Sequence, residues 1–451
     1  MHVHEYSIDV RPDSREFSDI VKHLVQNGHV ALLRETAAIM KEKTGMGIAP
    51  EEFFAIPHPG RSISRSGSVL GMEVFCQQSC YLFLISPMED LPEMLYDRFS
   101  RYAFQDPTRF RRLQMGIASK GEMPKEILEK FQLDVVQAIK NHVDGRKLRG
   151  KTFEWIADPP FGRGLALFLG ESTEEGVAPR FQYTEALYSP EELACVAVLE
   201  KNPCRRMLQS VLTKGRILSE VAAQNGESAA YEELFQCGLL RREHLVSCVK
   251  EGKPLTHVPS REHLANTTIG QLPCPECGRK FAEEKIEEIL IPTEMARELT
   301  SGSKWMQVWL TRELERNHIP VKDVKWNLHV EGGEEIDVVT SIFGNIVFFE
   351  LKDREFGLGD IYPFIYRMER YAADHGMIVT TEKVSGVTKT YIEERSRKER
   401  DESLGRVTYS EGIEESRRKI VQFVALLTRN YIGMRLRGFS PRVSLERIIT
   451  S

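Results

Sequence analysis

The chain has 451 residues, which is too long for one ordinary hydrophobic core and predicts two to four domains, of which we expect three. Hydrophobic residues make up 41% and charged residues 28%, and the mean hydropathy is -0.33, a balance that excludes a disordered chain. The formal net charge of -5 means that any site for a polyanion must be local. No apolar run is long enough to span a membrane and the first residues do not begin a secretory signal, so we expect a cytoplasmic protein without membrane contact.

The eight cysteines are scattered along the chain, which indicates a reducing compartment in which most of them are buried as small apolar side chains. They stand at positions 76, 80, 195, 204, 237, 248, 274 and 277. Cys76 and Cys80 have no matching second pair nearby and do not indicate a zinc site. The last three are considered below.

Residues 1–185 are predicted to form an N-terminal α/β domain with a sensing or recognition role. The predicted elements are strands at 6–10 and 81–85 and helices at 14–26 and 30–42. A loop at 60–71, rich in serine, arginine and glycine, could bind an anion through Arg61 and Arg65, but a polar connector is favoured. The sequence does not show what this region binds.

Residues 186–290 are predicted to form a small connector domain. The sequence Ser-Pro-Glu-Glu at 189–192 is a capping box with proline at the first helical position, and it opens a helix through Glu200. Short helices at 219–223 and 229–236, followed by a probable strand, resemble a winged helix. Such units bind DNA, but they also serve as spacers or dimer surfaces.

The connector also contains a sequence typical of a zinc knuckle. Cys274-Pro-Glu-Cys277-Gly supplies two thiolates on a tight turn, which is half of a tetrahedral zinc site. Cys248-Val-Lys-Glu251-Gly repeats this spacing with a glutamate in place of a fourth cysteine. The segment resembles a zinc ribbon, and either it binds structural Zn²⁺ through three cysteines and a fourth ligand or it is a ribbon without metal. The candidates for the fourth ligand are Glu251, His244, His257 and His263.

The stretch from Glu334 to Arg354 carries the strongest chemical signal. Residues 346–349 are apolar on both faces, as expected of a central strand covered by layers on either side. Because side chains alternate along a strand, Glu350 and Lys352 are expected on one face at its end. An acid and an ammonium at the end of a buried strand cost free energy unless they are paired or hold a metal.

The preceding strand supplies a second acid. Residues 335–339 are followed by a turn that we assign to Gly344 and Asn345, and a short hairpin would bring Asp337 beside Glu350. Two carboxylates and a lysine would then converge. The alternative is a surface hairpin with an ordinary cross-strand ion pair.

Asp337 followed by Glu350-Leu351-Lys352 resembles the motif of the PD-(D/E)xK, or restriction-endonuclease-like, nuclease superfamily. The resemblance covers residues 291–451. It implies that Asp337, Glu350 and the backbone carbonyl of Leu351 bind Mg²⁺ or Mn²⁺, and that Lys352 positions a water molecule. Hard oxygen ligands and a nearby ammonium suit such a metal and the hydrolysis of a phosphodiester.

The flanking elements are predicted in the order of the family core. They are a helix at 304–316 capped by Ser303, the hairpin, a helix at 361–372 capped by Asp360, and a strand at 377–380. The branch that the chain most resembles has Trp-Leu-Glu in the first helix, with the glutamate facing the metal. This chain has Trp305-Met306-Gln307, so Gln307 and also Glu335 are secondary catalytic candidates.

Four groups of basic residues could contact phosphates, although a solvated surface is the more ordinary role of each. They are Arg109, Arg111 and Arg112; Arg146, Lys147, Arg149 and Lys151; Arg205, Arg206, Lys214 and Arg216; and Arg417, Arg418, Lys419, Arg435, Arg437 and Arg442.

The sequence thus predicts a multidomain α/β protein with an N-terminal α/β domain, a winged-helix and zinc-ribbon-like connector, and a restriction-endonuclease-like core with a mixed central sheet. The predicted function is a divalent-metal-dependent nuclease of DNA or RNA. The last two domains resemble prokaryotic defence effectors, including CRISPR-associated nucleases switched on by cyclic oligonucleotides, which implies a small-ligand activator and a homodimer or a partner in a defence complex. The competing hypothesis is a catalytically weak or inactive nuclease-fold subunit that binds nucleic acid or acts as a scaffold, and Gln307 leaves it open.

Overall fold

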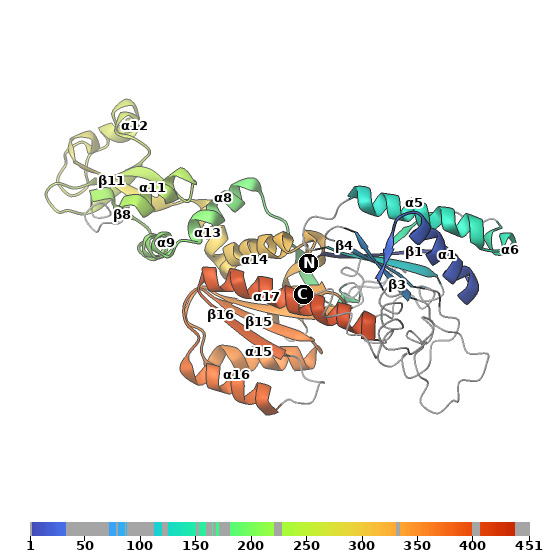
Figure 1. The fold of residues 1–451 in the computed structure, drawn as a ribbon. Coiled ribbons are helices and arrows are strands. Elements are labelled where there is room, and N and C mark those ends of the chain that lie inside the picture. Colours follow the sequence, from blue (N-terminus) through green and yellow to red (C-terminus); the bar gives the residue numbers. More distant parts are fainter. Residues whose placement is uncertain are drawn as a thin grey trace.

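The computed structural model of the protein is α/β, and its described residues form three sheets (Figure 1). Among these residues no helix is both long and apolar enough to cross a membrane. The structure describes residues 2–32, 72–77, 80–85, 87, 112–119, 125–149, 153–158, 165, 168–170, 181–220, 228–330, 334–398 and 406–437.

The N-terminal sheet has the strand order β2-β3-β4-β5-β1-β6, and every neighbouring pair is antiparallel. Its strands are β1 His2–Ile8, β2 Val30–Ala31, β3 Met72–Gln77, β4 Cys80–Ile85, β5 Leu113–Ser119 and β6 Ile156–Asp158. Helices α1 Ser14–Gln26 and α5 Lys125–His142 pack on one face and close a core of their own, and α6 Gly145–Leu148 follows. Asp13 and Glu16 cap α1 reciprocally.

The prediction of a helix at 30–42 is wrong at its start. Gly28, with φ of 89°, ends the turn after α1, and Val30 then pairs with Cys76 of β3. The chain therefore returns to the sheet at residues 30 and 31, and within the described part of the predicted range only Leu32 is helical. The rest of that range, like the loop at 60–71, lies outside the described residues.

The middle region contains a second sheet, with the order β10-β9-β11-β8. Its strands are β8 Ile217–Leu218, β9 Leu240–Ser247, β10 Pro254–Val258 and β11 Lys285–Pro292. Its helices are α8 Pro190–Leu199, α9 Asn202–Lys214, α11 Ser228–Gln236 and α12 Arg261–Asn266, with the 3₁₀ helices η2 Thr268–Gln271 and η3 Phe281–Glu283. The capping box predicted before α8 is present, because Ser189 and Glu192 bond to each other's backbone N–H.

The C-terminal sheet is mixed, as predicted, and has the order β16-β15-β14-β13-β12-β7. Strands β14, β15 and β16 are parallel, and the remaining pairs are antiparallel. The strands are β7 Gln182–Glu185, β12 Val324–Val330, β13 Glu334–Ile342, β14 Asn345–Lys352, β15 His375–Thr380 and β16 Arg406–Glu411. The helices are α13 Glu294–Thr300, α14 Lys304–Arg316, α15 Leu358–Arg370, α16 Gly386–Lys398 and α17 Ile413–Arg437, with short 3₁₀ turns η4 Ser301–Ser303 and η5 Val321–Asp323.

Strand β14 lies in the centre of this sheet, and both of its faces are covered (Figure 1). Val347, Phe349 and Leu351 belong to the core cluster that includes α14 and α17, whereas Phe348 belongs to the cluster that includes α15 and α16. The apolar run at 346–349 is therefore a central strand between two helical layers, as predicted.

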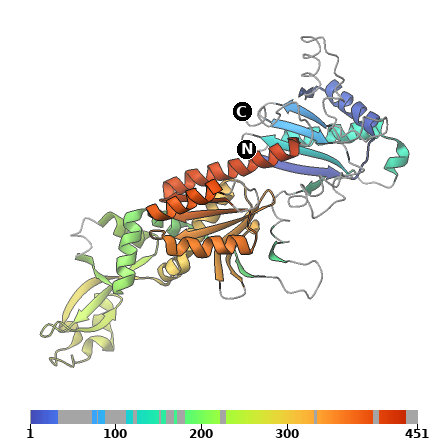
Figure 2. The ribbon, with the colours of Figure 1, turned by 90° about the horizontal axis from the view of Figure 1, so that it is seen from below.

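Strand β7 falls within the range expected for the N-terminal domain, yet it pairs with β12 at the edge of the C-terminal sheet. Leu165 and Phe181 likewise belong to a C-terminal core cluster. A division at residue 185 therefore separates β7 from its own sheet. Conversely, Val74 and Phe83 of the N-terminal sheet belong to the cluster that contains α14 and α17. Figure 2 shows α17 running from the C-terminal sheet toward the N-terminal one.

Candidate functional site

The candidate site lies at one end of the β13–β14 hairpin. The antiparallel register pairs Val338 with Phe349, which places Asp337 opposite Glu350. The turn itself consists of Phe343 and Gly344, with φ values of 51° and 82°, and Asn345 already belongs to β14. The assignment of the turn to Gly344 and Asn345 was therefore displaced by one residue, because a two-residue turn of this hand needs positive φ at both central positions.

Asp337 accepts a hydrogen bond from the backbone N–H of Leu351 at 2.7 Å. Burial, followed by the nearby carboxylate of Glu350, raises the pKa of Asp337 to about 7. Among the described residues no cation lies within 4.0 Å of its carboxylate. Asp337 thus has no direct ion-pair partner among the described residues, although the ammonium of Lys352 attracts it from a greater distance.

Glu350 is buried between two cations. Its Oε1 atom lies 2.9 Å from the Lys352 Nζ, and its Oε2 accepts a hydrogen bond of 2.7 Å from the Arg367 guanidinium on α15. Burial lowers the pKa of Lys352, but the carboxylates of Glu350 and Asp337 outweigh this effect and raise it, so that Lys352 is held as the ammonium.

Arg367 was not predicted from the sequence. It lies on the buried side of α15 among apolar residues such as Phe364 and Met368. An arginine at a buried helical position is a signal that an acid lies opposite, because a guanidinium is rarely buried without a partner. The periodicity of the helix could have suggested the burial, but not which acid it would contact.

Gln307 on α14 is 2% exposed and adjoins the hairpin. Its Nε2 donates to the Oδ1 atom of Asn327 and, at 3.3 Å, to the backbone carbonyl of Asp337. It therefore contacts the backbone of the site rather than its carboxylates. Glu335 lies on the same strand as Asp337 but is exposed, and its charge adds to the forces that raise the pKa of Asp337.

Of the two predicted helix caps, Ser303 stands at the predicted position but its side chain does not cap the helix, and Asp360 is displaced. Ser303 precedes α14, but it has φ of 58° and makes no capping hydrogen bond with its side chain. Asp360 lies in the first turn of α15, where it accepts a hydrogen bond of 3.0 Å from the N–H of Gly357. Hence Gly357 stands at the cap and Asp360 at the third helical position, since an acid there satisfies an N–H that the helix leaves free.

Asp353, the residue after Lys352, connects the site to the middle region. Its carboxylate accepts hydrogen bonds from the Trp305 indole at 3.1 Å and from the Thr381 hydroxyl at 2.9 Å. Arg205 of α9, which is buried, lies 3.4 Å from the same carboxylate. The end of β14, which carries Lys352, is thus anchored to α14 through Trp305, to the residue after β15 through Thr381, and to α9 through Arg205.

The donor set of this site fits a divalent cation that prefers oxygen ligands. Asp337 and Glu350 are neighbouring carboxylates, and the raised pKa of Asp337 shows that a further positive charge would be favourable there. A role for the Leu351 carbonyl as a ligand stays a prediction.

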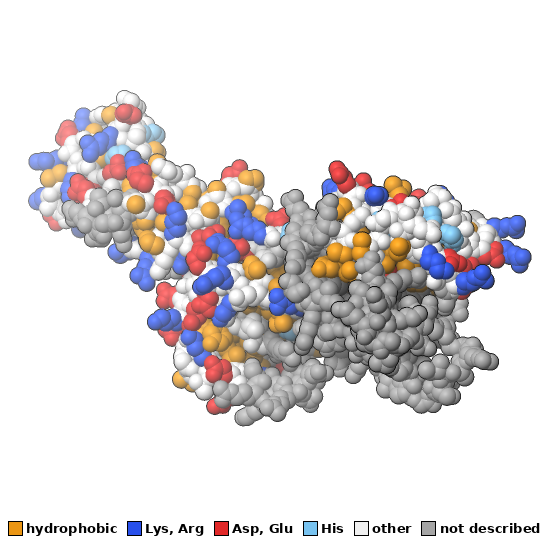
Figure 3. All heavy atoms as spheres, in the orientation of Figure 1, with side chains coloured by type: hydrophobic (Ala, Val, Ile, Leu, Met, Phe, Trp, Pro, Cys, Tyr) orange, Lys and Arg blue, Asp and Glu red, His pale blue; other side chains and the backbone are white. Residues whose placement is uncertain are grey.

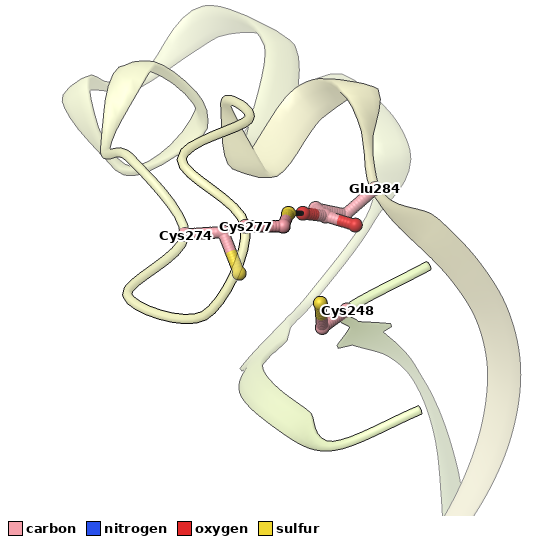
Figure 4. Close-up of side chains that lie close together, drawn as sticks. All are labelled: Cys248, Cys274, Cys277 and Glu284. Atoms are coloured by element: carbon pink, nitrogen blue, oxygen red, sulfur yellow. Dashed lines mark hydrogen bonds between the residues drawn. The ribbon is translucent and has the colours of Figure 1, made fainter. Parts of the chain in front are cut away.

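A second group of potential ligands lies in the middle region (Figure 4). The sulfurs of Cys248, Cys274 and Cys277 and a carboxylate oxygen of Glu284 all lie within 4.8 Å of one another. The Cys277 thiol donates to Glu284 Oε1 at 2.8 Å, which raises the pKa of Cys277 to about 12 and lowers the pKa of Glu284. The structure therefore brings the three predicted cysteines together with a glutamate that the sequence did not single out.

Glu251, the predicted fourth member, does not belong to this group. Its backbone N–H points to the Cys248 sulfur, and its side chain is exposed. His244, His257 and His263 are also outside the group; His257 instead lies 2.9 Å from the Arg216 guanidinium. Glu284 was missed because it comes from the far end of the segment, just before β11, where no spacing rule applies.

Some members of the basic groups, including Arg205 and Lys419, pair with carboxylates of the protein. Lys147 contacts Asp13 and Glu16, and Arg417 contacts Glu200, Glu313 and Glu414, each with a carboxylate. On the face in Figure 3, basic and acidic side chains of the described residues alternate over the surface. Arg109, Arg111, Lys151 and Arg442 lie outside the described residues, as do the side chains of Arg435 and Arg437.

The winged-helix resemblance stays a prediction. Strands β8, β11 and β9 form an antiparallel ladder next to α11. Helix α11 has the sequence Ser-Ala-Ala-Tyr-Glu-Glu-Leu-Phe-Gln, with two acids and no base. Such a helix would repel phosphates, which favours the role of a spacer over that of a DNA reader.

Comparison with known proteins gives a limited result. No protein-family model matches the chain, and no curated protein is similar to it. Among solved structures the chain is similar to protein VC1899 from Vibrio cholerae, with 12% identity and a TM-score of 0.29 over 54% of this chain and 57% of that one. It is also similar to Can2 from Sulfobacillus thermosulfidooxidans in complex with cyclic tetra-adenylate, with 12% identity and a TM-score of 0.32 over 66% of this chain and 78% of that one.

Proposed function

We propose that the protein is a divalent-metal-dependent nuclease that hydrolyses phosphodiester bonds of DNA or RNA. The observation that supports it is the convergence of Asp337, Glu350 and Lys352 at the end of the β13–β14 hairpin, where Asp337 has no direct ion-pair partner among the described residues and its pKa is raised. Structural acids in a sheet are ordinarily neutralised by a neighbouring base, and a residual need for positive charge is typical of functional sites.

In this proposal Asp337 and Glu350 would hold Mg²⁺ or Mn²⁺, with the Leu351 carbonyl as a further ligand. Such an ion would supply polarisation of the phosphate and a lower pKa for a bound water. Lys352 orients the water or offsets the charge that develops on the phosphate. Arg367 acts as a positioning residue, because its hydrogen bond to Glu350 fixes one oxygen of that carboxylate.

A catalytically weak or inactive nuclease-fold subunit that binds nucleic acid or acts as a scaffold is the second candidate. Two observations favour it: both oxygens of Glu350 are already engaged by cations, and an amide, Gln307, stands where an acid would add charge. A metal would have to share Glu350 with Lys352 and Arg367. Cleavage assays separate the two candidates.

The test uses the purified full chain with labelled single- and double-stranded DNA and RNA, in Mg²⁺, in Mn²⁺ and in EDTA. We expect cleavage of at least one polymer that requires metal and is lost in Asp337→Asn, Glu350→Gln and Lys352→Ala. Lys389→Ala is the matched control, because Lys389 also pairs with a carboxylate of this domain, that of Glu411, which lies on β16, two strands away from β14. Cleavage by the three variants at the wild-type rate would refute the assigned site.

We further propose that the N-terminal domain regulates the nuclease, as a prokaryotic defence effector requires, through a small activating ligand. A separate core in this domain, and its contact with the cluster that holds α14 and α17, support a regulatory rather than a chemical role. A ligand can activate only if it binds the active arrangement more tightly than the resting one. Cleavage assays with a panel of nucleotides, including the cyclic tetra-adenylate named for Can2, test this.

Light scattering tests whether the purified protein is a homodimer or a monomer that binds a partner in a defence complex.

A further inference from the structure

We propose that Cys248, Cys274, Cys277 and Glu284 bind one structural Zn²⁺ that closes the middle region. This inference is independent of the proposed nuclease function. It rests on two matched turns, on the position of Glu284, on the chemistry of the four ligands and on the small core around them.

The first turn follows β9. The N–H of Cys248 donates to the carbonyl of Lys253 at 2.9 Å, and the N–H of Gly252 donates back to the carbonyl of Cys248 at 2.7 Å. Gly252 has φ of 66°, which a residue with a side chain rarely adopts. The turn thus presents the Cys248 sulfur to backbone N–H groups that stabilise a thiolate.

The second turn has the same hydrogen bonds. The N–H of Cys274 donates to the carbonyl of Arg279 at 2.6 Å, and the N–H of Gly278, at φ of 78°, donates to the carbonyl of Cys274 at 2.8 Å. Two turns of one geometry face each other, and together they present three sulfurs (Figure 4). Such paired turns are the usual scaffold of a structural zinc site.

Glu284 occupies the fourth corner. Its Oε2 accepts a hydrogen bond of 2.6 Å from the N–H of Val249 in the first turn, and its Oε1 lies 2.8 Å from the Cys277 sulfur in the second. The carboxylate therefore spans both turns, with one oxygen oriented by the backbone and the other among the sulfurs. Glu251, the equivalent of Cys277 in the first turn, is exposed and leaves this corner to Glu284.

The four ligands select zinc. Thiolates do not suit Mg²⁺ or Ca²⁺, whereas three thiolates and a carboxylate complete a tetrahedral zinc shell. With Zn–S bonds of about 2.3 Å, tetrahedral sulfurs lie about 3.8 Å apart, so ligand atoms now within 4.8 Å need to close by only about 1 Å. A shell of four protein ligands has no open position for substrate, which makes the role structural.

The surrounding core is too small to hold this segment by itself. Its buried members are Val246, Cys248, Val258, Leu264, Cys274 and Phe281, so two of the six are ligands. Units with so little apolar surface are ordinarily stabilised by a metal or by disulfides. The zinc would tie the end of β9 to the start of β11 across the whole intervening segment.

Metal content and cobalt substitution of the full chain test the proposal. We expect one zinc per chain by elemental analysis of protein purified without chelator. Replacement by Co²⁺ should give the visible bands of a tetrahedral ion together with thiolate charge-transfer absorption for three sulfurs. Wild-type protein that contains no zinc and binds no cobalt with these bands would overturn the proposal, whether its thiols are then free or oxidised.

Two isosteric variants separate the candidate fourth ligands. Glu284→Gln should lower the affinity for zinc at least about tenfold, since even neighbours of ligands contribute that much. Glu251→Gln is the matched control on the equivalent turn and should leave the affinity unchanged. The reverse result would refute the role of Glu284. Because both variants keep all three cysteines, misfolding of a cysteine variant does not confuse the outcome.

Discussion

The fold strongly favours the protonated form of Asp337. Its pKa of about 7 exceeds the ordinary 3.8, so between these values the folded, metal-free protein retains a proton that the unfolded chain has released. Its free energy of unfolding therefore falls as the pH rises through this range and levels off above it. Asp337→Asn removes this dependence.

We predict that wild type and Asp337→Asn have similar stability near pH 4 and that the variant is more stable at pH 8 by about 1–3 kcal/mol. Urea denaturation in EDTA at a series of pH values measures this difference. Parallel curves for the two proteins would show that Asp337 titrates normally. The variant keeps an oxygen that can accept the N–H of Leu351, so the comparison isolates the charge.

Arg367 supports Glu350, and its removal leaves a buried carboxylate with Lys352 as its remaining partner. We predict that Arg367→Met lowers the free energy of unfolding by about 2–4 kcal/mol. Arg370→Met on the same helix is the control: the Arg370 side chain is 43% exposed, against 11% for Arg367, and its contact with Glu334 is 3.7 Å. A change within about 0.5 kcal/mol is expected there. Equal losses in both variants would place Arg367 outside the site.

Gln307→Glu looks conservative on the sequence alone, since it restores the acid of the related motif. In the structure the Gln307 amide donates to Asn327 and to the Asp337 carbonyl, and a carboxylate would face these two oxygens. We predict that Gln307→Glu lowers the free energy of unfolding by about 1–3 kcal/mol in EDTA and that added Mn²⁺ makes this loss smaller. Thermal unfolding with and without Mn²⁺ checks this, and an equal loss in both conditions would mean that residue 307 does not face the metal.

At the scale of elements, the hairpin depends on its two-residue turn. Gly344 has φ of 82°, whereas Phe343 adopts φ of 51° and stacks on Tyr431 of α17. We predict that Gly344→Ala lowers the free energy of unfolding by about 1–2 kcal/mol and raises the metal concentration needed for cleavage. Gly359→Ala is the control, because Gly359 lies in the first turn of α15 with open space around it, and a small gain in stability is expected. Chemical denaturation of both variants decides this, and equal losses would contradict the strain assigned to the turn.

The elements around the site were predictable because each follows a local rule. Helical periodicity of the apolar residues predicted α14 and α15, and the apolar run at 346–349 predicted β14. The alternation of side chains along a strand predicted that Glu350 and Lys352 lie on one face. The partners of these residues were not predictable. Arg367 and Glu284 reach their contacts across distances in the chain that no spacing rule describes, and Phe343 adopts its positive φ through packing on α17.

At the scale of the whole molecule, a domain boundary at residue 185 would separate β7 from the C-terminal sheet in which it pairs with β12. A four-residue strand with mostly exposed side chains carries almost no signal in a sequence, and only pairing with β12 shows where it belongs. We predict that a fragment from 186 to 451 is less stable and more prone to aggregate than one from 160 to 451. The shorter fragment exposes the edge of β12 and lacks the apolar side chains of Leu165 and Phe181. Circular dichroism and size-exclusion chromatography compare them, and equal behaviour would make β7 dispensable.

The position of β7 also determines the order in which parts of the chain can fold during translation. The C-terminal sheet has β7 at one edge and β16 at the other, and the entire middle region leaves the ribosome between β7 and β12. Contacts so distant in sequence form late, whereas the contiguous middle region can fold as soon as it emerges. Strand β14, which carries Lys352, therefore gains its parallel neighbour β15 and the cover of α17 only after residues 375–437 have been translated. A nascent chain that ends before α17 would accordingly carry the β13–β14 hairpin with one face of β14 still uncovered.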